Sequence, residues 1–288
     1  MNFSGRNKMN GVKKLACSVI VSAAAALCAT SALAETAGAR LADAGVKAEV
    51  GAGYADAKRY TFKFEGYKAY FDEPVAAKPG RQWVWCMKWP GAFAEFTGQV
   101  DCVRRGYYYV YLDDIDWMSP KGVEIAKRFH DFLVGKLGFA AKANLIGMSW
   151  GGFYSTRYAA AHPEDVSRIY FDAPLMNFAS FTLSGWPAAK VWGSPECGDW
   201  SKDLRMPINL ADKIAKAKIP VLLLYGGADT VVPPSKNCEI FIPRFKAAGG
   251  DIKVFKRDMY GHHPHGFQGA ENVGAIVDFF EGKPVSVK

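Results

Sequence analysis

Short apolar runs alternate with amphipathic stretches along most of the chain after residue 57. In the stretches between the runs, apolar residues recur at the spacing of one helix face. This alternation is typical of βαβ units that build a mostly parallel sheet. The strands we predict are 60–64, 67–71, 83–87, 107–112, 143–147, 166–171, 220–225 and 252–255, and the helices are 99–105, 120–137, 151–161, 209–218, 234–248 and 271–280.

A long interruption of this pattern lies at 174–207, between the strand predicted at 166–171 and the helix predicted at 209–218. It contains four prolines and three tryptophans, and its apolar residues follow no clear period. A loop of that length inside a compact domain is usually functional. We expect a small lid, in which Trp186 and Trp192 either contact the substrate or only pack the lid onto the body.

The first 34 residues have the three parts of a signal peptide. Basic residues precede an apolar, Ala-rich run at 15–30, and Ala32-Leu33-Ala34 forms an A-x-A cleavage pattern. The run is too short for a comfortable membrane anchor. We therefore expect export to the periplasm or the medium after cleavage near Ala34, a flexible mature N-terminus at 35–57 and one domain at 58–288.

The charge of the chain is only mildly basic once the leader is removed. The net charge of +8 then falls to +4, because the 36 basic residues lose four and the 28 acidic residues lose none. No block of Lys and Arg forms a nucleic-acid footprint, and no later stretch is long and apolar enough to span a bilayer. We therefore expect that the protein neither binds nucleic acid nor spans a membrane.

Four cysteines remain after the predicted cleavage: Cys86, Cys102, Cys197 and Cys238. An exported chain with an even number of cysteines can form disulfides, and four cysteines allow three connectivities among which the sequence does not choose. Cys86 with Cys102, and Cys197 with Cys238, are the pairings we consider. Buried free thiols are the alternative. The spacing lacks the C-x-x-C pairs of a zinc knuckle, which makes that kind of metal site improbable.

The pentapeptide at 147–151 reads Gly-Met-Ser-Trp-Gly, a G-x-S-x-G motif. It follows the strand predicted at 143–147 and opens the helix predicted at 151–161, which is the context of a nucleophile elbow. Glycines are needed on both sides because the serine sits in a strained, crowded turn. The motif predicts Ser149 as a nucleophile.

A serine hydroxyl needs a base to take its proton, and the base needs an acid to orient it. Asp229 follows the apolar strand predicted at 220–225, so it lies at the carboxyl end of a strand, where open α/β sheets bind ligands. Asp172 follows the preceding strand and is the alternative acid. The order Ser, acid, His along the chain favours Asp229.

The base must follow the acid, and three histidines do so: His262, His263 and His265. We favour His262, which directly follows Gly261, over His265 and then His263. Three clustered imidazoles also raise the possibility of a metal site. The surrounding sequence provides no carboxylate cluster as a second shell, so we expect no metal here.

These features together resemble the α/β-hydrolase superfamily over roughly residues 58–288. The resemblance rests on the elbow at 147–151, the Asp229 loop, Gly261-His262 with the helix after it, and the loop at 87–91. That loop reads Met-Lys-Trp-Pro-Gly where many members have His-Gly-aromatic-Pro-Gly. The resemblance implies an α/β fold with a mostly parallel sheet, helices on both faces and a small lid insertion, and an oxyanion hole formed by the backbone N–H groups of Trp89 and Trp150.

The implied chemistry is acyl transfer by a Ser149–His262–Asp229 triad without a cofactor. We expect a secreted hydrolase that acts on a small-molecule or glycan carboxylic ester. A peptidase or amidase of the same fold, and a carbon–carbon or haloperoxidase activity, are the closest alternatives. A non-catalytic binding protein that retains the fold is the alternative from another class. The sequence leaves the ester and the oligomeric state open.

Overall fold

The computed structural model describes residues 35–269, 272 and 274–287 of the 288-residue chain. The predicted signal peptide at 1–34 lies outside the described residues and stays a prediction. Residues from Ala37 onward form one unit built around a single sheet. Within the described ranges, no helix has both the length and the apolar character that crossing a bilayer requires.

The sheet has nine strands in the described part of the chain, in the order β1-β2-β3-β5-β4-β6-β7-β8-β9. Strands β1 to β3 and β5 pair antiparallel, whereas β5, β4, β6, β7, β8 and β9 pair parallel. The mostly parallel sheet predicted from the sequence is confirmed. The strands are β1 (Glu49–Ala52), β2 (Lys58–Phe64), β3 (Tyr67–Glu73), β4 (Trp83–Cys86), β5 (Tyr108–Leu112), β6 (Ala143–Met148), β7 (Val166–Asp172), β8 (Val221–Gly226) and β9 (Ile252–Arg257).

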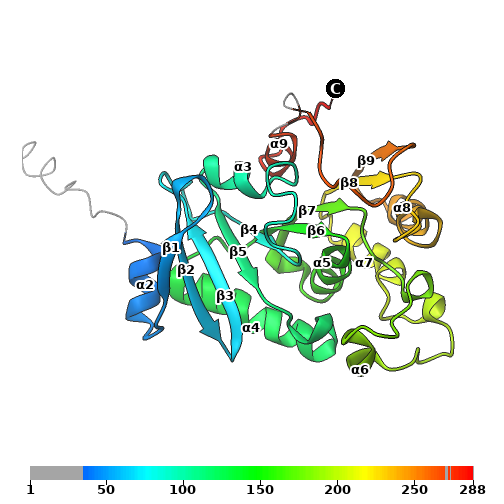
Figure 1. The fold of residues 1–288 in the computed structure, drawn as a ribbon, viewed down its shortest axis with the longest axis horizontal. Coiled ribbons are helices and arrows are strands. Elements are labelled where there is room, and N and C mark those ends of the chain that lie inside the picture. The colour runs from blue at the N-terminus through cyan, green and yellow to red at the C-terminus, as the bar shows by residue number, and fades with distance from the viewer. Residues whose placement is uncertain (1–34, 270–271, 273, 288) are drawn as a thin grey trace, which may run out of the picture. The chain divides into compact units, whose positions relative to one another are not determined.

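Helices cover both faces of the sheet (Figure 1). The inner strands alternate their side chains between two apolar clusters. In β8, for example, Leu223 faces one cluster and Leu222 and Leu224 face the other. Helices α2, α4, α5, α7 and α8 pack on the first cluster, and α3 and α9 on the second. Their bounds are α2 (Ala37–Asp43), α3 (Gln99–Arg104), α4 (Pro120–Leu137), α5 (Trp150–Ala161), α6 (Ala188–Trp192), α7 (Ala211–Lys216), α8 (Cys238–Ala247) and α9 (Ala275–Phe280).

Helix α4 shows why the sequence pattern locates these elements well. Ser119 caps its N-terminus by accepting a hydrogen bond from the Gly122 N–H at 3.2 Å, and Pro120 occupies the first turn. Gly138 ends the helix with φ of 71°, a conformation that costs glycine little. Both ends of the helix are therefore encoded by local residues.

The segment 35–57 differs from the flexible terminus that we expected. Helix α2 and strand β1 form within it, and Ala37 donates its backbone N–H to Glu73 Oε1 at 2.8 Å. A Cβ on Gly38 would lie 2.2 Å from Tyr60 Cζ, so the small residues of this segment permit close packing on the sheet. The lack of an apolar period reflects that close approach.

All four cysteines of the described chain are free thiols. Neither of the two pairings that we considered, Cys86 with Cys102 and Cys197 with Cys238, is formed. Cys86 is buried on β4, where its thiol donates to the Lys88 carbonyl at 3.2 Å, while Cys197 is exposed. Three of the thiols are thus packed as small apolar groups in the core.

Candidate active site

Ser149 occupies a sharp bend between β6 and α5. Its φ of 51° and ψ of −118° are unusual for a residue with a side chain. Three hydrogen bonds of 2.9 Å hold the bend: the Ser149 N–H donates to the Asp172 carbonyl, and the Ser149 carbonyl accepts from Gly152 N–H and Leu175 N–H. The chain therefore has the strained strand-to-helix turn that the motif predicts.

Two of the three glycines around Ser149 are required by packing, and the third makes an ordinary contact. A Cβ on Gly147 would lie 2.7 Å from Ser155 Oγ, and one on Gly152 would lie 2.2 Å from Pro174 Cβ. A Cβ on Gly151 would lie 3.4 Å from the backbone nitrogen of Lys88. The elbow is therefore wedged between its own helix, the chain that leaves β7 and the loop after β4.

The structure brings Ser149, His262 and Asp229 together in one hydrogen-bonded chain. His262 Nε2 lies 3.1 Å from Ser149 Oγ, and His262 Nδ1 lies 2.7 Å from Asp229 Oδ2. The other oxygen of Asp229 accepts backbone N–H groups from Val231 and Val232, both at 2.8 Å. Because the carboxylate accepts from Nδ1–H, Nε2 is left as the acceptor that faces the serine hydroxyl.

Two glycines explain how the acid and base loops meet. A Cβ on Gly226 would lie 2.2 Å from the Tyr260 carbonyl oxygen, and one on Gly227 would lie 2.9 Å from the Asp258 carbonyl oxygen. The backbone after β8 can therefore approach the backbone after β9 closely, and the Ala228 N–H donates to the Tyr260 carbonyl at 2.9 Å. This contact sets His262 beside Asp229.

A second His–Asp pair lies next to the first. His265 Nδ1 lies 2.9 Å from Asp172 Oδ1, while Tyr170 hydroxyl and Gly266 N–H donate to Asp172 Oδ2 at 2.6 and 2.5 Å. Burial alone would raise the pKa of Asp172, but the bond and charge of His265, with the other two donors, hold the pKa of this carboxyl below its usual range. Sequence reasoning named both residues as alternatives and missed that they would pair with each other.

Comparison with known proteins supports the fold. A family profile described as alpha/beta hydrolase fold matches residues 119–189, which include the elbow. The chain has the α/β-hydrolase fold, and the matched segment spans about a quarter of it. No curated protein matches it in sequence.

Solved structures of two kinds share this hydrolase fold. The acylaminoacyl peptidase of Pyrococcus horikoshii aligns with a TM-score of 0.57 and 14% identity, over 84% of this chain and 42% of that one. The dipeptidyl peptidase 4 of Porphyromonas gingivalis aligns with a TM-score of 0.55 and 12% identity, over 82% and 34%. The S-formylglutathione hydrolase of Agrobacterium tumefaciens aligns with a TM-score of 0.56 and 14% identity, over 75% and 91%. The chain thus spans less than half the length of these two peptidases.

A cavity of about 330 Å³ opens over Ser149. Its walls are mostly aromatic and aliphatic, and among the described residues that line it there is no Asp, Glu, Lys or Arg. Trp186 lies in its wall. The lining residues are Trp89, Ala92, Phe93, Met148, Ser149, Trp150, Leu175, Phe181, Trp186, Val231, Val232, His262, His263 and His265.

Trp192, our other candidate for substrate contact, lies elsewhere. It is 4% exposed, and its indole N–H donates to the Trp117 carbonyl at 3.0 Å. Its ring packs 5.2 Å from Phe153 and 5.3 Å from Phe178, and the Arg157 guanidinium lies 4.7 Å above it. Trp192 therefore fastens the segment 174–207 to helix α5, and the role of this segment as a lid stays a prediction.

The two predicted oxyanion donors both lie beside Ser149 in the cavity wall. Trp150 is the first residue of α5, so its N–H has no partner within the helix. Trp89 has φ of 61° in the loop after β4, whose backbone approaches the elbow at Gly151.

The loop departs from the family pattern at Lys88, and the structure gives this lysine a role of its own. The Lys88 ammonium group pairs with Asp114 and lies 4.9 Å above the Trp117 ring. Burial lowers the pKa of Lys88, which is only 5% exposed. The unusual Met87-Lys88 pair was the only sign of this ion pair in the sequence. The sequence could not identify the partner, because Asp114 lies on another loop.

Proposed function

We propose that this chain is a serine hydrolase that cleaves carboxylic esters through an acyl-enzyme intermediate. The observation that carries the proposal is the continuous hydrogen-bonded chain from Asp229 through His262 to Ser149 at the floor of the cavity. Nucleophile, base and orienting acid are the three parts that acyl transfer by serine requires.

In the proposed reaction, His262 Nε2 takes the Ser149 proton as Oγ attacks the ester carbonyl carbon. Asp229 fixes the imidazole tautomer and stabilises the imidazolium. The N–H groups of Trp89 and Trp150 donate to the oxyanion of the tetrahedral intermediate. His262 then gives its proton to the departing alkoxide, and a water activated by the same nitrogen releases the acid and restores Ser149.

The cavity favours an uncharged, apolar ester. Aromatic rings form much of its wall, and its polar groups are Ser149 and three histidines. A charged substrate would lose its hydration on entering the cavity, and the wall has no opposite charge to compensate for that loss. We therefore propose a small-molecule ester with an aliphatic or aromatic acyl group, and not a highly charged one.

A peptidase or amidase is the second candidate, because two of the structural neighbours are peptidases. An amide differs from an ester in its leaving group, which needs full protonation by His262 before it departs. A matched pair of substrates with the same acyl group, one a p-nitrophenyl ester and one a p-nitroanilide, separates the two. Because the p-nitrophenyl ester is intrinsically far more reactive, the deciding result is whether the anilide is cleaved at all. Anilide hydrolysis that Ser149→Ala abolishes would favour the peptidase, and an uncleaved anilide beside a cleaved ester would favour the esterase.

Export is part of the proposal, because the first 34 residues have the pattern of a signal peptide. We expect the mature protein to begin at Glu35. N-terminal sequencing of the protein recovered from the periplasm or medium of the producing cells tests this. Retention of the intact leader in a cytoplasmic protein would contradict it.

The direct test of the activity is a panel of p-nitrophenyl esters of increasing acyl length. We expect hydrolysis by the wild-type protein and a loss of about 10⁵-fold or more in kcat for Ser149→Ala. Ser155→Ala is the matched control, since it removes another buried hydroxyl that binds the Gly151 carbonyl at 2.8 Å. Activity that persists in Ser149→Ala would reject the mechanism, and inactivity of the wild type on every ester and amide would favour the binding protein.

A further inference from the structure

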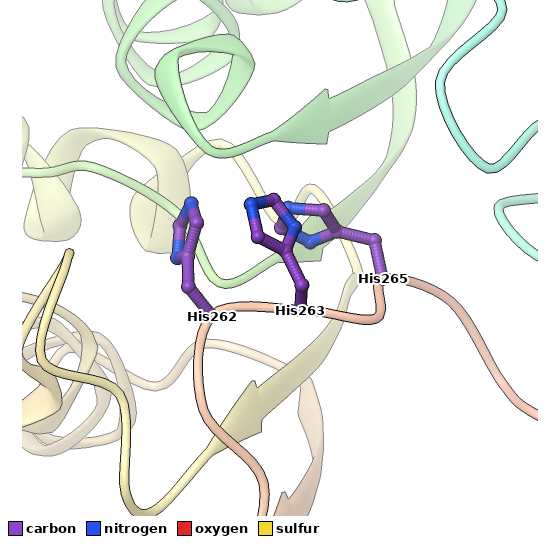
Figure 2. Close-up of side chains that lie close together, drawn as sticks. All are labelled: His262, His263 and His265. Carbon is purple, nitrogen blue, oxygen red and sulfur yellow. The ribbon is translucent and has the colours of Figure 1, made fainter.

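The three histidines at 262–265 project from one loop segment toward the elbow (Figure 2). Their ring centroids lie 4.8 to 4.9 Å apart in every pair. One ring nitrogen from each lies within 4.8 Å of those of the other two, and all three rings line the cavity. A hydrolase triad needs one of these imidazoles, so the cluster provides two more than the proposed reaction uses.

Two of the three rings are held from behind by buried carboxylates. His262 donates Nδ1–H to Asp229, and His265 donates Nδ1–H to Asp172. Metal-binding histidines almost always donate their second ring N–H in this way, because the carboxylate fixes the tautomer and makes the ligating nitrogen more basic. The local sequence contains no supporting carboxylates, because Asp229 lies 33 positions before His262 and Asp172 lies 93 positions before His265.

The donor set suits one class of ion. Three imidazoles and an open fourth position are the ligands of several zinc sites, and nitrogen donors also bind other late first-row divalent ions, whereas Ca²⁺ and Mg²⁺ prefer oxygen. Tetrahedral bonds of about 2.0–2.1 Å need nitrogen atoms roughly 3.4 Å apart. His263 is exposed, and its ring contacts Phe93 and the other two imidazoles, so a turn of this side chain would bring its nitrogen closer to theirs.

We propose that His262, His263 and His265 bind one Zn²⁺-like ion, and that this ion inhibits the hydrolase. The metal would occupy the Nε2 lone pair of His262, which lies 3.1 Å from Ser149 Oγ and accepts the serine proton in the proposed reaction. The inhibition rests on the proposed function, whereas the binding does not. Occupied by metal, His262 can no longer act as a base.

The other histidine clusters of the described chain fit an ion less well. The group of His130, Asp131 and Asp165 provides one imidazole, and the Nε2 of that imidazole lies 3.0 Å from the Ala141 carbonyl. The group of His162, Glu164 and Asp165 lies at the end of α5 and provides one imidazole. It offers a control for Zn²⁺ that binds elsewhere.

Binding is tested with Zn²⁺ alone, added to the protein after EDTA treatment and desalting. We expect one Zn²⁺ per chain in calorimetry, and visible absorption bands of tetrahedral Co²⁺ when Co²⁺ replaces it. Ser149→Ala should bind Zn²⁺ within about threefold of wild type, because the ligands remain. Loss of hydrolysis should follow the binding curve and reverse with EDTA.

Variants locate the site. His263→Ala and His265→Gln should each raise the Kd for Zn²⁺ at least 10-fold. The Zn²⁺ concentration that gives half-maximal inhibition should rise by the same factor. Inhibition is expressed for each variant relative to its own rate without zinc. His162→Gln should leave the Kd unchanged.

Three outcomes overturn the proposal: no Zn²⁺ binding by wild type and Ser149→Ala, binding that only His162→Gln weakens, or hydrolysis that Zn²⁺ at the cluster does not reduce. A protein that binds Zn²⁺ through the cluster but cleaves no ester or amide without it would support the site and reject the hydrolase function instead.

Discussion

At the scale of single residues, the backbone strain at Ser149 is the most informative feature. A non-glycine residue at φ of 51° costs of the order of 1–3 kcal/mol and persists only where its surroundings enforce it. Here the enforcement is visible in the three backbone hydrogen bonds that join Ser149 to Asp172, Gly152 and Leu175. The strain keeps the hydroxyl at the end of the parallel strands, within reach of His262.

Asp229→Asn tests the orienting role of the acid. The amide keeps the shape but allows its NH₂ group to face Nδ1, which favours the tautomer that cannot accept the serine proton. We expect kcat on the best ester to fall about 10³- to 10⁴-fold with little change in the fold. Steady-state kinetics beside a circular dichroism spectrum measures both. A loss below tenfold would remove Asp229 from the triad.

Asp172→Asn is the matched substitution at the other His–Asp pair. We expect it to lower mainly the free energy of unfolding. Because the pKa of Asp172 is lowered on folding, its stabilisation is present above the unfolded pKa of about 3.9 and is lost as pH falls through the folded value. Urea unfolding at pH 7 should show a loss of about 2–3 kcal/mol relative to wild type, shrinking below pH 4. A difference that grew in acid would contradict this.

The sequence could predict which residue types would meet, but not all of the pairings. The elbow motif selected Ser149, and the chain order together with a place just after a buried strand selected Asp229. The preference for His262 over His265 rested only on its place after Gly261, because the choice of base depends on how the 260–265 loop crosses Gly226 and Gly227. For the same reason the pairing of His265 with Asp172 became visible only in three dimensions.

At the scale of elements, the junction of β6 and α5 depends on glycines that leave no room for a methyl group. Gly152→Ala would place a Cβ 2.2 Å from Pro174 Cβ. We expect a loss of about 1–3 kcal/mol in unfolding free energy, since overpacked sites force backbone shifts. Ester hydrolysis should also fall, because the shift moves Ser149.

Gly135→Ala in helix α4 is the control for this prediction. Nothing lies within 4 Å of the Cβ it would add, and alanine is the better helix former. We expect a gain of about 0.5–1 kcal/mol without a change in activity. Equal effects of the two substitutions in urea unfolding would show that crowding at the elbow is not what fixes Gly152.

The two tryptophans of the segment 174–207 should separate substrate binding from packing. Trp186 lines the cavity, so Trp186→Ala should raise KM about tenfold for the preferred ester and flatten the preference for acyl length. Trp192→Ala should instead cost about 3–5 kcal/mol of stability, because its ring is buried on α5. The ester panel and thermal unfolding measure the two effects, and a reversed pattern would contradict the placement.

The helices and strands with a regular apolar pattern were predicted correctly from the sequence. The elements without such a pattern were missed. Helix α4 and the strands from β4 to β8 follow their patterns closely. Strand β1 has all four residues exposed, so it carries no apolar signal and forms by pairing with β2. Helix α2 buries Ala37, Gly38 and Leu41, and one large apolar residue beside two small ones gives little periodicity.

At the scale of the whole molecule, the reactivity of the four thiols shows which of them the core shields from solvent. Burial raises the pKa of Cys86 to about 11 and also raises the pKa values of Cys102 and Cys238. We expect Ellman's reagent to modify Cys197 quickly in the native protein and all four thiols of the processed chain after denaturation. Fewer than four thiols in the denatured, non-reduced protein would reveal a disulfide.

The α/β architecture was accessible from the sequence because alternating strands and helices permit few topologies. The order of strands was less accessible: β5 lies between β3 and β4, although β4 comes first in the chain. That crossover places the loop after β4 next to the elbow. Local pattern contains no information on such long-range pairing, so the position of Trp89 and Lys88 followed only from the family resemblance or from the structure.

The central claim is that Ser149 is an activated nucleophile, and covalent labelling tests it most directly. Incubation with a fluorophosphonate, followed by intact-mass measurement and peptide mapping, should give one adduct per chain, located on Ser149. The adduct should be absent from Ser149→Ala and should form at least 100-fold more slowly in His262→Ala. A wild-type protein that stays unlabelled, or an adduct mapped to another residue, would contradict the account.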